Sequence, residues 1–126
     1  MERYCLTYFL VQFGENFNLR DFCSLLGLSF VETKRFGTDC TLDIGRNEVF
    51  DVDINVMLRV TLKDLLGKEK QLAALKERYG LTYYLERVPT LVANSEAPNQ
   101  LLSLEPDIIE FLYTTQTIDD LDYYIV

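Results

Sequence analysis

The stretch LKDLLGKEKQLAALKERYGLTYYLERVPTLV, residues 62–92, decides the fold of this 126-residue chain. Leucines recur at helical spacing along its first two thirds, with a break at Gly67, and charged residues fill the opposite face. This pattern predicts an amphipathic helix that rests on a sheet through Leu72 and Leu75. Gly80 stands where a left-handed residue ends a helix, and the β-forming residues from 81 to 88 predict a strand.

A strand and a short helix are predicted near the start of the chain. Residues 3–13 are rich in aromatic and β-branched residues, which predicts a central strand. Asn18 is a candidate N-cap of the short helix, and Gly27 is its candidate end. The apolar face of this helix comprises Leu19, Phe22, Cys23, Leu25 and Leu26.

The middle of the chain predicts a hairpin and leaves one ambiguity. Residues 28–35 are a connection with some extended character, and residues 38–44 alternate as a strand does. Residues 45–47 have turn chemistry, so a hairpin into Glu48 is expected. Residues 50–62 fit both a long strand and a helix; we favour a strand to about Asp53 and a helix after it, capped by Asp53.

The C-terminal part predicts a loop, a helix and a closing strand. Residues 89–100 contain two of the three prolines and predict a polar loop. Pro106 suits the first turn of a last helix, which residues 108–113 make apolar on one side. Residues 122–126 predict the closing strand.

The predicted elements form one α+β domain over residues 1–126. Their order is strand, helix, strand, strand, helix, strand, helix, strand. The first six have the order of the ferredoxin-like fold. The predicted fold class is therefore a ferredoxin-like βαββαβ core with an added C-terminal helix and strand, and with helices on one face of a mainly antiparallel sheet.

Several short motifs resemble the bacterial domain-of-unknown-function family 4279. They are LRDFCSLLGL at 19–28, LAALKERYGLTYYLERV at 72–88, LSLEP at 102–106 and IDDLDYYIV at 118–126. The tryptophans that this family usually has between its first helix and its hairpin are missing here, and Phe36 and Cys40 lie near those places. The resemblance implies a bacterial protein of this element order, and it brings no established activity with it.

Charge and composition limit the kinds of molecule that this chain is expected to bind. The net charge is −8, and the last basic residue is Arg87, so the seven acids that follow it are not balanced by any base. Phosphate binding needs clustered cations, which argues against nucleic acid, whereas an acidic sector attracts a basic protein. Apolar runs fall short of the roughly 20 residues of a membrane span, and no signal-peptide pattern precedes the first strand, which predicts a cytoplasmic protein. Three widely spaced cysteines predict reduced, buried thiols.

Catalytic and metal-binding patterns are missing from the sequence. The chain has no histidine, which removes the commonest general base and metal ligand. Its glycines form no phosphate-binding motif, and the carboxylates at Asp51 and Asp53 and near the C-terminus lack EF-hand spacing. We therefore predict a protein that is not an enzyme and has no cofactor or metal site.

Tyrosines beside carboxylates in the C-terminal part are typical of a binding surface. The predicted function is a protein-binding module, immunity- or inhibitor-like, that binds a basic partner. The alternative is a small-molecule-binding or self-assembling ferredoxin-like domain. The chain is expected to be a monomer or a weak homodimer. The predicted partner-binding residues are Glu105, Asp107, Glu110, Tyr113, Asp119, Asp120, Asp122, Tyr123 and Tyr124.

Overall fold

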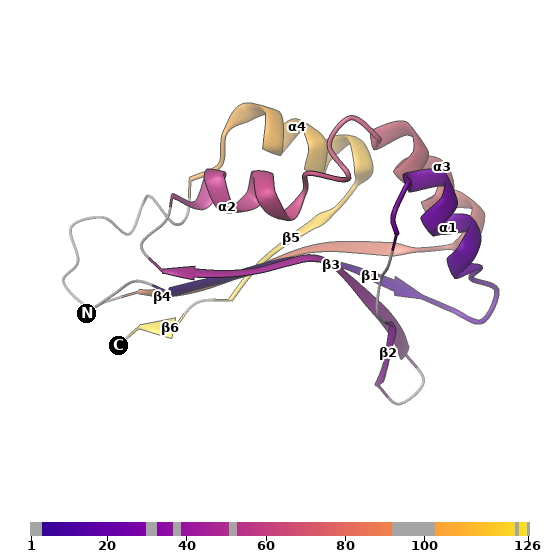
Figure 1. Cartoon of the computed structure of the whole chain (residues 1–126), viewed down its shortest axis with the longest axis horizontal. Helices are drawn as coiled ribbons and strands as arrows, with labels where there is room; N and C mark the ends of the chain where they lie inside the picture. The colour runs from indigo at the N-terminus through magenta and orange to yellow at the C-terminus, as the bar shows by residue number, and fades with distance from the viewer. Residues whose placement is uncertain are drawn as a thin grey trace.

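The first strand, β1 (Tyr4–Phe13), lies in the middle of a mixed sheet in the computed structural model of the chain (Figure 1). The structure describes residues 4–29, 33–36, 39–50, 53–91, 103–122 and 124–125. Both neighbours of β1 run antiparallel to it and extend along nearly its whole length. The prediction of a central first strand is confirmed.

The strand order is β2-β3-β1-β4-β5, and β6 also pairs with β4. Neighbours are antiparallel, except that β5 and β6 run parallel to β4. The bounds are β2 (Thr33–Phe36), β3 (Asp39–Phe50), β4 (Thr82–Leu91), β5 (Ile118–Leu121) and β6 (Tyr124–Ile125). The sheet therefore grows outward from β1 on both sides.

The helices α1 (Leu19–Leu26), α2 (Ile54–Thr61), α3 (Glu69–Tyr79) and α4 (Pro106–Thr115) all lie on one face of the sheet (Figure 1). Within the described part of the chain, no helix lies on the other face. The fold is thus of the α+β class, with one covered and one open sheet face. We call the latter the open face.

The helix boundaries follow the capping signals of the sequence. Asn18 Oδ1 accepts a hydrogen bond from the Asp21 N–H at 3.0 Å, and Asp53 Oδ1 accepts one from the Asn55 N–H at 2.8 Å. Gly27 and Gly80 both end their helices in the left-handed conformation. These four predicted boundaries are confirmed, and so is the choice of a helix after Asp53.

The core forms between the helices and the covered face. Leu72 and Leu75 of α3 are buried, as predicted. The helical spacing predicted from Leu62 is wrong for its first part, because residues 62–67 form a turn that ends with Gly67 and separates α2 from α3, which begins at Glu69. Leu25, predicted for the apolar face of α1, is instead 46% exposed, because the helix turns Phe22 and Leu26 toward the core. Further buried residues include Cys5, Phe9, Val11, Leu42, Ile44, Ile54, Leu58, Tyr83, Leu85 and Phe111.

The predicted hairpin at 45–47 is wrong. Strand β3 continues through Gly45, and the register with β1 shifts between Thr7 and Phe9, so Gly45 belongs to a β-bulge. Its φ of 68° is the left-handed conformation that bulges and turns share, which is why the sequence pattern suggested a turn. The hairpin lies between β2 and β3 instead, and β2 occupies a segment for which only some extended character was predicted.

The bulge is the point where α2 meets the sheet. A Cβ at Gly45 would lie 2.0 Å from the carbonyl oxygen of Thr61, the last residue of α2. The hydroxyl of Thr61 also hydrogen-bonds to that of Thr7 on β1, at 2.7 Å in the buried interior. Glycine is therefore required at this position for close approach as well as for φ.

The end of the chain differs from the prediction as well. The closing strand expected at 122–126 is preceded by β5, which lies four residues earlier than the predicted start, and only the two residues of β6 fall inside the predicted range. The loop expected at 89–100 begins later than predicted, because β4 extends to Leu91; residues 92–100 lie outside the described part of the chain. Among the described residues, no helix has both the length and the apolar character needed to cross a membrane.

Replacement of Gly45 by alanine should destabilise the fold much more than the same change at Gly80. Both glycines have a left-handed φ, but a Cβ at Gly80 meets no atom within 4 Å. We expect Gly80→Ala to lower the free energy of unfolding by about 1 kcal/mol and Gly45→Ala by roughly 2–5 kcal/mol, since overpacking is added to the backbone strain. Urea unfolding measures both, and equal losses would show that α2 does not press on the bulge.

Candidate partner-binding surface

The described residues among the predicted binding residues come from two elements of the fold, α4 and β5. Glu105, Asp107, Glu110 and Tyr113 lie at or along α4, whereas the aspartates of 119–122 lie on or beside β5. Tyr123, and the side chain of Tyr124, lie outside the described part of the structure. The described residues separate into an ion-pair cluster, a groove and a sheet-face cluster.

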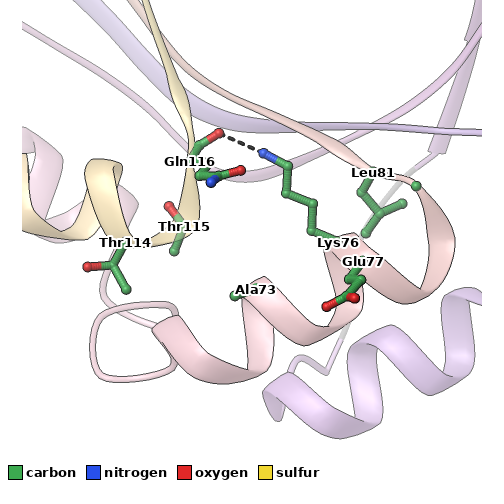
Figure 2. A pocket seen from close by; sticks show the side chains of 8 residues that line it. Ala73, Lys76, Glu77, Leu81, Thr114, Thr115 and Gln116 are labelled. Atoms are coloured by element: carbon green, nitrogen blue, oxygen red, sulfur yellow. Dashed lines mark hydrogen bonds between the residues drawn. The ribbon is translucent and has the colours of Figure 1, made fainter.

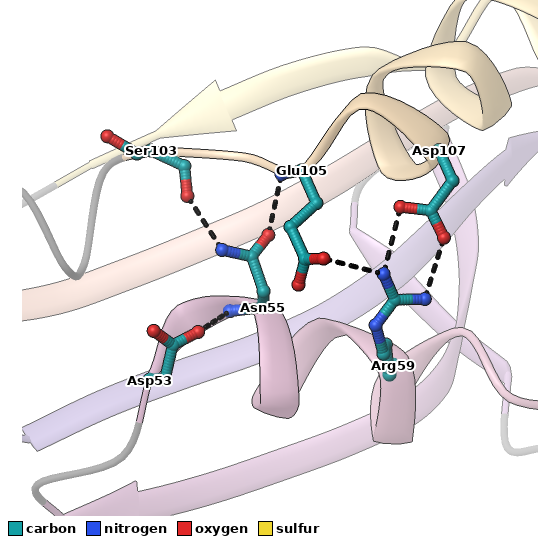
Figure 3. A network of polar contacts seen from close by, with 6 residues as sticks. All are labelled: Asp53, Asn55, Arg59, Ser103, Glu105 and Asp107. Carbon is teal, nitrogen blue, oxygen red and sulfur yellow. Dashed lines mark hydrogen bonds and ion pairs between the residues drawn. The ribbon is translucent and has the colours of Figure 1, made fainter.

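The ion-pair cluster joins the start of α4 to α2 (Figure 3). Arg59 holds Asp107 through two hydrogen bonds, of 2.7 and 2.9 Å, and Glu105 through one of 3.2 Å. The hydrogen bonds from Arg59 lower the pKa of Asp107 below its usual range. Because one guanidinium already neutralises much of their charge, Glu105 and Asp107 contribute to helix packing more than to an acidic binding surface.

Asn55 completes this junction. Its side-chain NH₂ donates to the Ser103 carbonyl at 3.1 Å, and its side-chain oxygen accepts from the Glu105 N–H at 2.8 Å (Figure 3). The chain is thereby fixed just before α4 begins at Pro106. These contacts orient α4, and with it Tyr113.

A groove runs between α4 and β5, and we call it the α4–β5 groove. Tyr113 is 84% exposed and Ile109 is 52% exposed one turn earlier on the same helix. Ile118, at the start of β5, is 49% exposed, but it aligns with Tyr84 on the open face and does not line the groove. The groove has a volume of about 720 Å³ and is lined by Ile109, Leu112, Tyr113, Thr114, Gln116, Thr117 and Asp119. Two predicted residues, Tyr113 and Asp119, are thus brought together.

Asp119 has a structural partner that the sequence analysis did not assign. Arg87 of β4 is only 3% exposed, and its Nε and Nη2 donate to the two carboxylate oxygens of Asp119 at 2.8 and 2.7 Å. A charge so deeply buried is stable only when it is paired. The strict alternation of Tyr83, Leu85 and Arg87 places this arginine on the covered face, and that alternation was the signal that could have revealed it.

Asp120 points to the other side of the sheet, where it meets Glu86. The two residues are directly opposite in the parallel pairing of β4 with β5. The pKa of Glu86 is raised to about 8, first by burial and then by the hydrogen bond and the charge of Asp120, with further repulsion from Asp122 and Asp43. Like charges in cross-strand positions repel, and a proton held at Glu86 relieves that repulsion.

Tyr8 and Arg46 extend this cluster across the open face. Tyr8 pairs with Glu86 across β1 and β4, and the guanidinium carbon of Arg46 lies 5.2 Å from the centre of the Tyr8 ring. Arg46 also forms ion pairs with Asp43 at 3.8 Å and with Glu48 at 3.6 Å. Asp120, with Asp122 beside it, was predicted from the sequence as a site residue, whereas the other residues of this row were not, because the row is assembled from four strands.

A separate open pocket of about 640 Å³ lies where α3 and α4 end, lined by Ala73, Lys76, Glu77, Gly80, Leu81 and residues 114–116 (Figure 2). The ammonium of Lys76 donates to the Gln116 carbonyl at 2.8 Å, and burial lowers its pKa. Lys76 therefore satisfies the C-terminal end of α4 rather than standing ready for a ligand. The alternative function, small-molecule binding, would use this pocket, whose volume suits such a site.

Comparison with known proteins adds no family. No family model matches the chain, and neither the curated proteins nor the solved structures that were searched contain a match. The resemblance to domain-of-unknown-function family 4279 therefore stays a prediction. Among the described residues, no group of three or more His, Cys, Asp or Glu side chains is arranged to hold a metal ion.

The raised pKa of Glu86 predicts a stability that falls as pH rises. Between the ordinary value of a glutamate and about 8, the folded state binds a proton that the unfolded state does not, so deprotonation disfavours folding. From about pH 5 to about pH 8, the urea midpoint of the wild type should fall relative to that of Glu86→Gln, which cannot lose a proton.

Glu110→Gln is the matched control, because it removes one carboxylate at an exposed position of α4. Its pH profile should follow that of the wild type. Parallel profiles for the wild type and Glu86→Gln would refute the raised pKa of Glu86.

Proposed function

We propose that this chain is a protein-binding module that takes a basic, partly apolar segment of another protein into the α4–β5 groove. The observation that carries the proposal is Tyr113, which is 84% exposed and lies one turn after Ile109, itself 52% exposed. Exposed aromatic side chains grouped with aliphatic ones occur more often on protein-binding surfaces than on the rest of a protein's surface.

Charge supports a basic partner. The described residues that line the groove include Asp119, whose charge is paired with Arg87, and no lysine or arginine. Asp120 follows on β5 and faces the other side of the sheet, so it adds negative charge near the groove without lining it. Glu110 is exposed on α4, the helix that forms one wall. The sequence has no basic residue after Arg87, so the positive charges near this sector come only from earlier segments. Such a field speeds the encounter with a positively charged segment, and tyrosine burial supplies much of the affinity.

We also infer that the first four strands and the helices between them form a ferredoxin-like arrangement. Support comes from the described order β2-β3-β1-β4 with antiparallel neighbours, and from helices on one face only. Two helices, α2 and α3, stand between β3 and β4 where the βαββαβ pattern has one. An immunity- or inhibitor-like role belongs to the same proposal, since such proteins act by binding alone.

The test is selection of binding peptides from a random display library on the immobilised protein. The selected peptides should be enriched in Lys and Arg next to apolar residues. Titration of a synthetic copy should show affinity that weakens with salt and that falls at least about tenfold in Tyr113→Ala.

The chain offers a matched control on a neighbouring helix. Val56 and Val60 of α2 are 55% and 48% exposed and, like Ile109 and Tyr113, lie one turn apart. Val56→Ala with Val60→Ala should leave peptide affinity unchanged. Peptides with no excess of basic residues, or peptides that bind Tyr113→Ala as well as the wild type, would overturn the proposal.

A further inference from the structure

The two outer strands of the described sheet carry opposite charges. β2 (Thr33–Phe36, TKRF) and β5 (Ile118–Leu121, IDDL) are the ends of the strand order, and each is four residues long. Within the described part of the chain, neither has a pairing partner on its outer side. A free edge exposes backbone N–H and C=O groups to which another strand can bind.

We propose that β5 of one copy of this chain pairs with β2 of a second copy. Following the pairings across the sheet, β2 and β1 run in one direction, and β3, β4 and β5 run in the other. A second copy that continues the sheet in the same orientation therefore places its β2 antiparallel to β5 of the first. The contact would extend the sheet and keep the helices of both copies on one face.

The antiparallel alignment of the two four-residue strands puts unlike charges opposite each other. Lys34 falls opposite Asp120, and Arg35 falls opposite Asp119. The ends of the alignment bring the apolar Phe36 opposite Ile118, and Thr33 opposite Leu121. Opposite charges in direct cross-strand pairs stabilise antiparallel strands.

The register also matches the two faces of the sheet. Lys34 aligns with Thr41 on β3, which aligns with Gln12 on β1. Asp120 aligns with Glu86 on β4, which aligns with Tyr8 on β1. Tyr8 and Gln12 are four residues apart and so occupy the same face of β1. Lys34 and Asp120 are thus both at open-face positions, as a continuous sheet requires. The charges of the two strands alone would not have ensured that these two residues share a face.

The same charges exclude the symmetric alternatives. Two antiparallel β5 strands with matched faces would place Asp120 opposite Asp120 or Asp119 opposite Asp119. Two β2 strands would likewise place Lys34 opposite Lys34 or Arg35 opposite Arg35, so each edge repels its own kind. The contact is head-to-tail, which leads to chains or closed rings rather than to a two-fold dimer. Because each contact spans only four residues per copy, association is expected to be weak and sensitive to salt.

Sedimentation velocity over a concentration series, up to about 1 mM at low ionic strength, measures this association. The mean mass of the wild type should rise with concentration and return to the monomer value at about 0.5 M salt. Lys34→Asp and Asp120→Lys should each remain monomeric, because each variant places two like charges opposite each other at positions 34 and 120. An equimolar mixture of the two should associate again, because position 34 of one variant then meets an opposite charge at position 120 of the other.

Lys70→Asp and Glu110→Lys are the matched controls, because they make the same charge changes at exposed positions of α3 and α4. Both should associate as the wild type does, and circular dichroism checks that every variant is folded. The inference does not rest on the proposed function, and Tyr113→Ala, which tests that function, leaves both edges intact. The proposal is overturned if the wild type stays monomeric at every concentration. It is also overturned if both edge variants still associate, or if their mixture stays monomeric.

Discussion

The ion pair between Arg87 and Asp119 is the interaction on which the C-terminal part of the structure depends. Strand β5 has only four residues, lies at the edge of the described sheet and, among the described strands, pairs with β4 alone. Backbone hydrogen bonds alone hold such a strand weakly. The two-pronged hydrogen bond from a guanidinium that is 3% exposed ties the strand to the protein interior. It thereby positions one wall of the α4–β5 groove and the acidic edge of the sheet.

Two adjacent residues of β4 interact in opposite ways with the two aspartates of β5: one attracts its aspartate and the other repels it. Arg87 faces the covered side and needs the charge of Asp119, whereas Glu86 faces the open side and is repelled by that of Asp120. Because side chains alternate along a strand, β5 places Asp119 in a stabilising ion pair on the covered face and Asp120 in a repulsive carboxylate pair on the open face. Asp119 is therefore chiefly a structural residue, and Asp120 is the aspartate that remains available to a partner or a second copy.

The features predicted from the sequence are those set by local physics. They include the N-caps at Asn18 and Asp53, the glycines that end α1 and α3, and the buried leucines of α3. Each of these features depends on residues within a few positions of each other. Gly45 was misassigned because a left-handed glycine suits a turn and a bulge equally, and only the register with β1 separates them. The cluster around Glu86 could not be predicted, because it depends on strand pairings between residues far apart in the chain. The ion pairs of Arg59 with Glu105 and Asp107, and the groove that Tyr113 shares with Asp119, likewise join residues far apart in the chain and could not be read from local patterns.

The anchoring of β5 through Arg87 is tested most directly by amide hydrogen exchange. The N–H of Asp122, just after β5, donates to the Arg87 carbonyl at 3.0 Å, so its exchange rate reports whether the end of β5 is in place. In Asp119→Ala this amide should exchange at least about tenfold faster than in the wild type, whereas amides shared by β1 and β3 keep their protection. Asp120→Ala, which leaves the ion pair intact, should show the wild-type rate. Equal protection of the Asp122 amide in Asp119→Ala and the wild type would contradict the account.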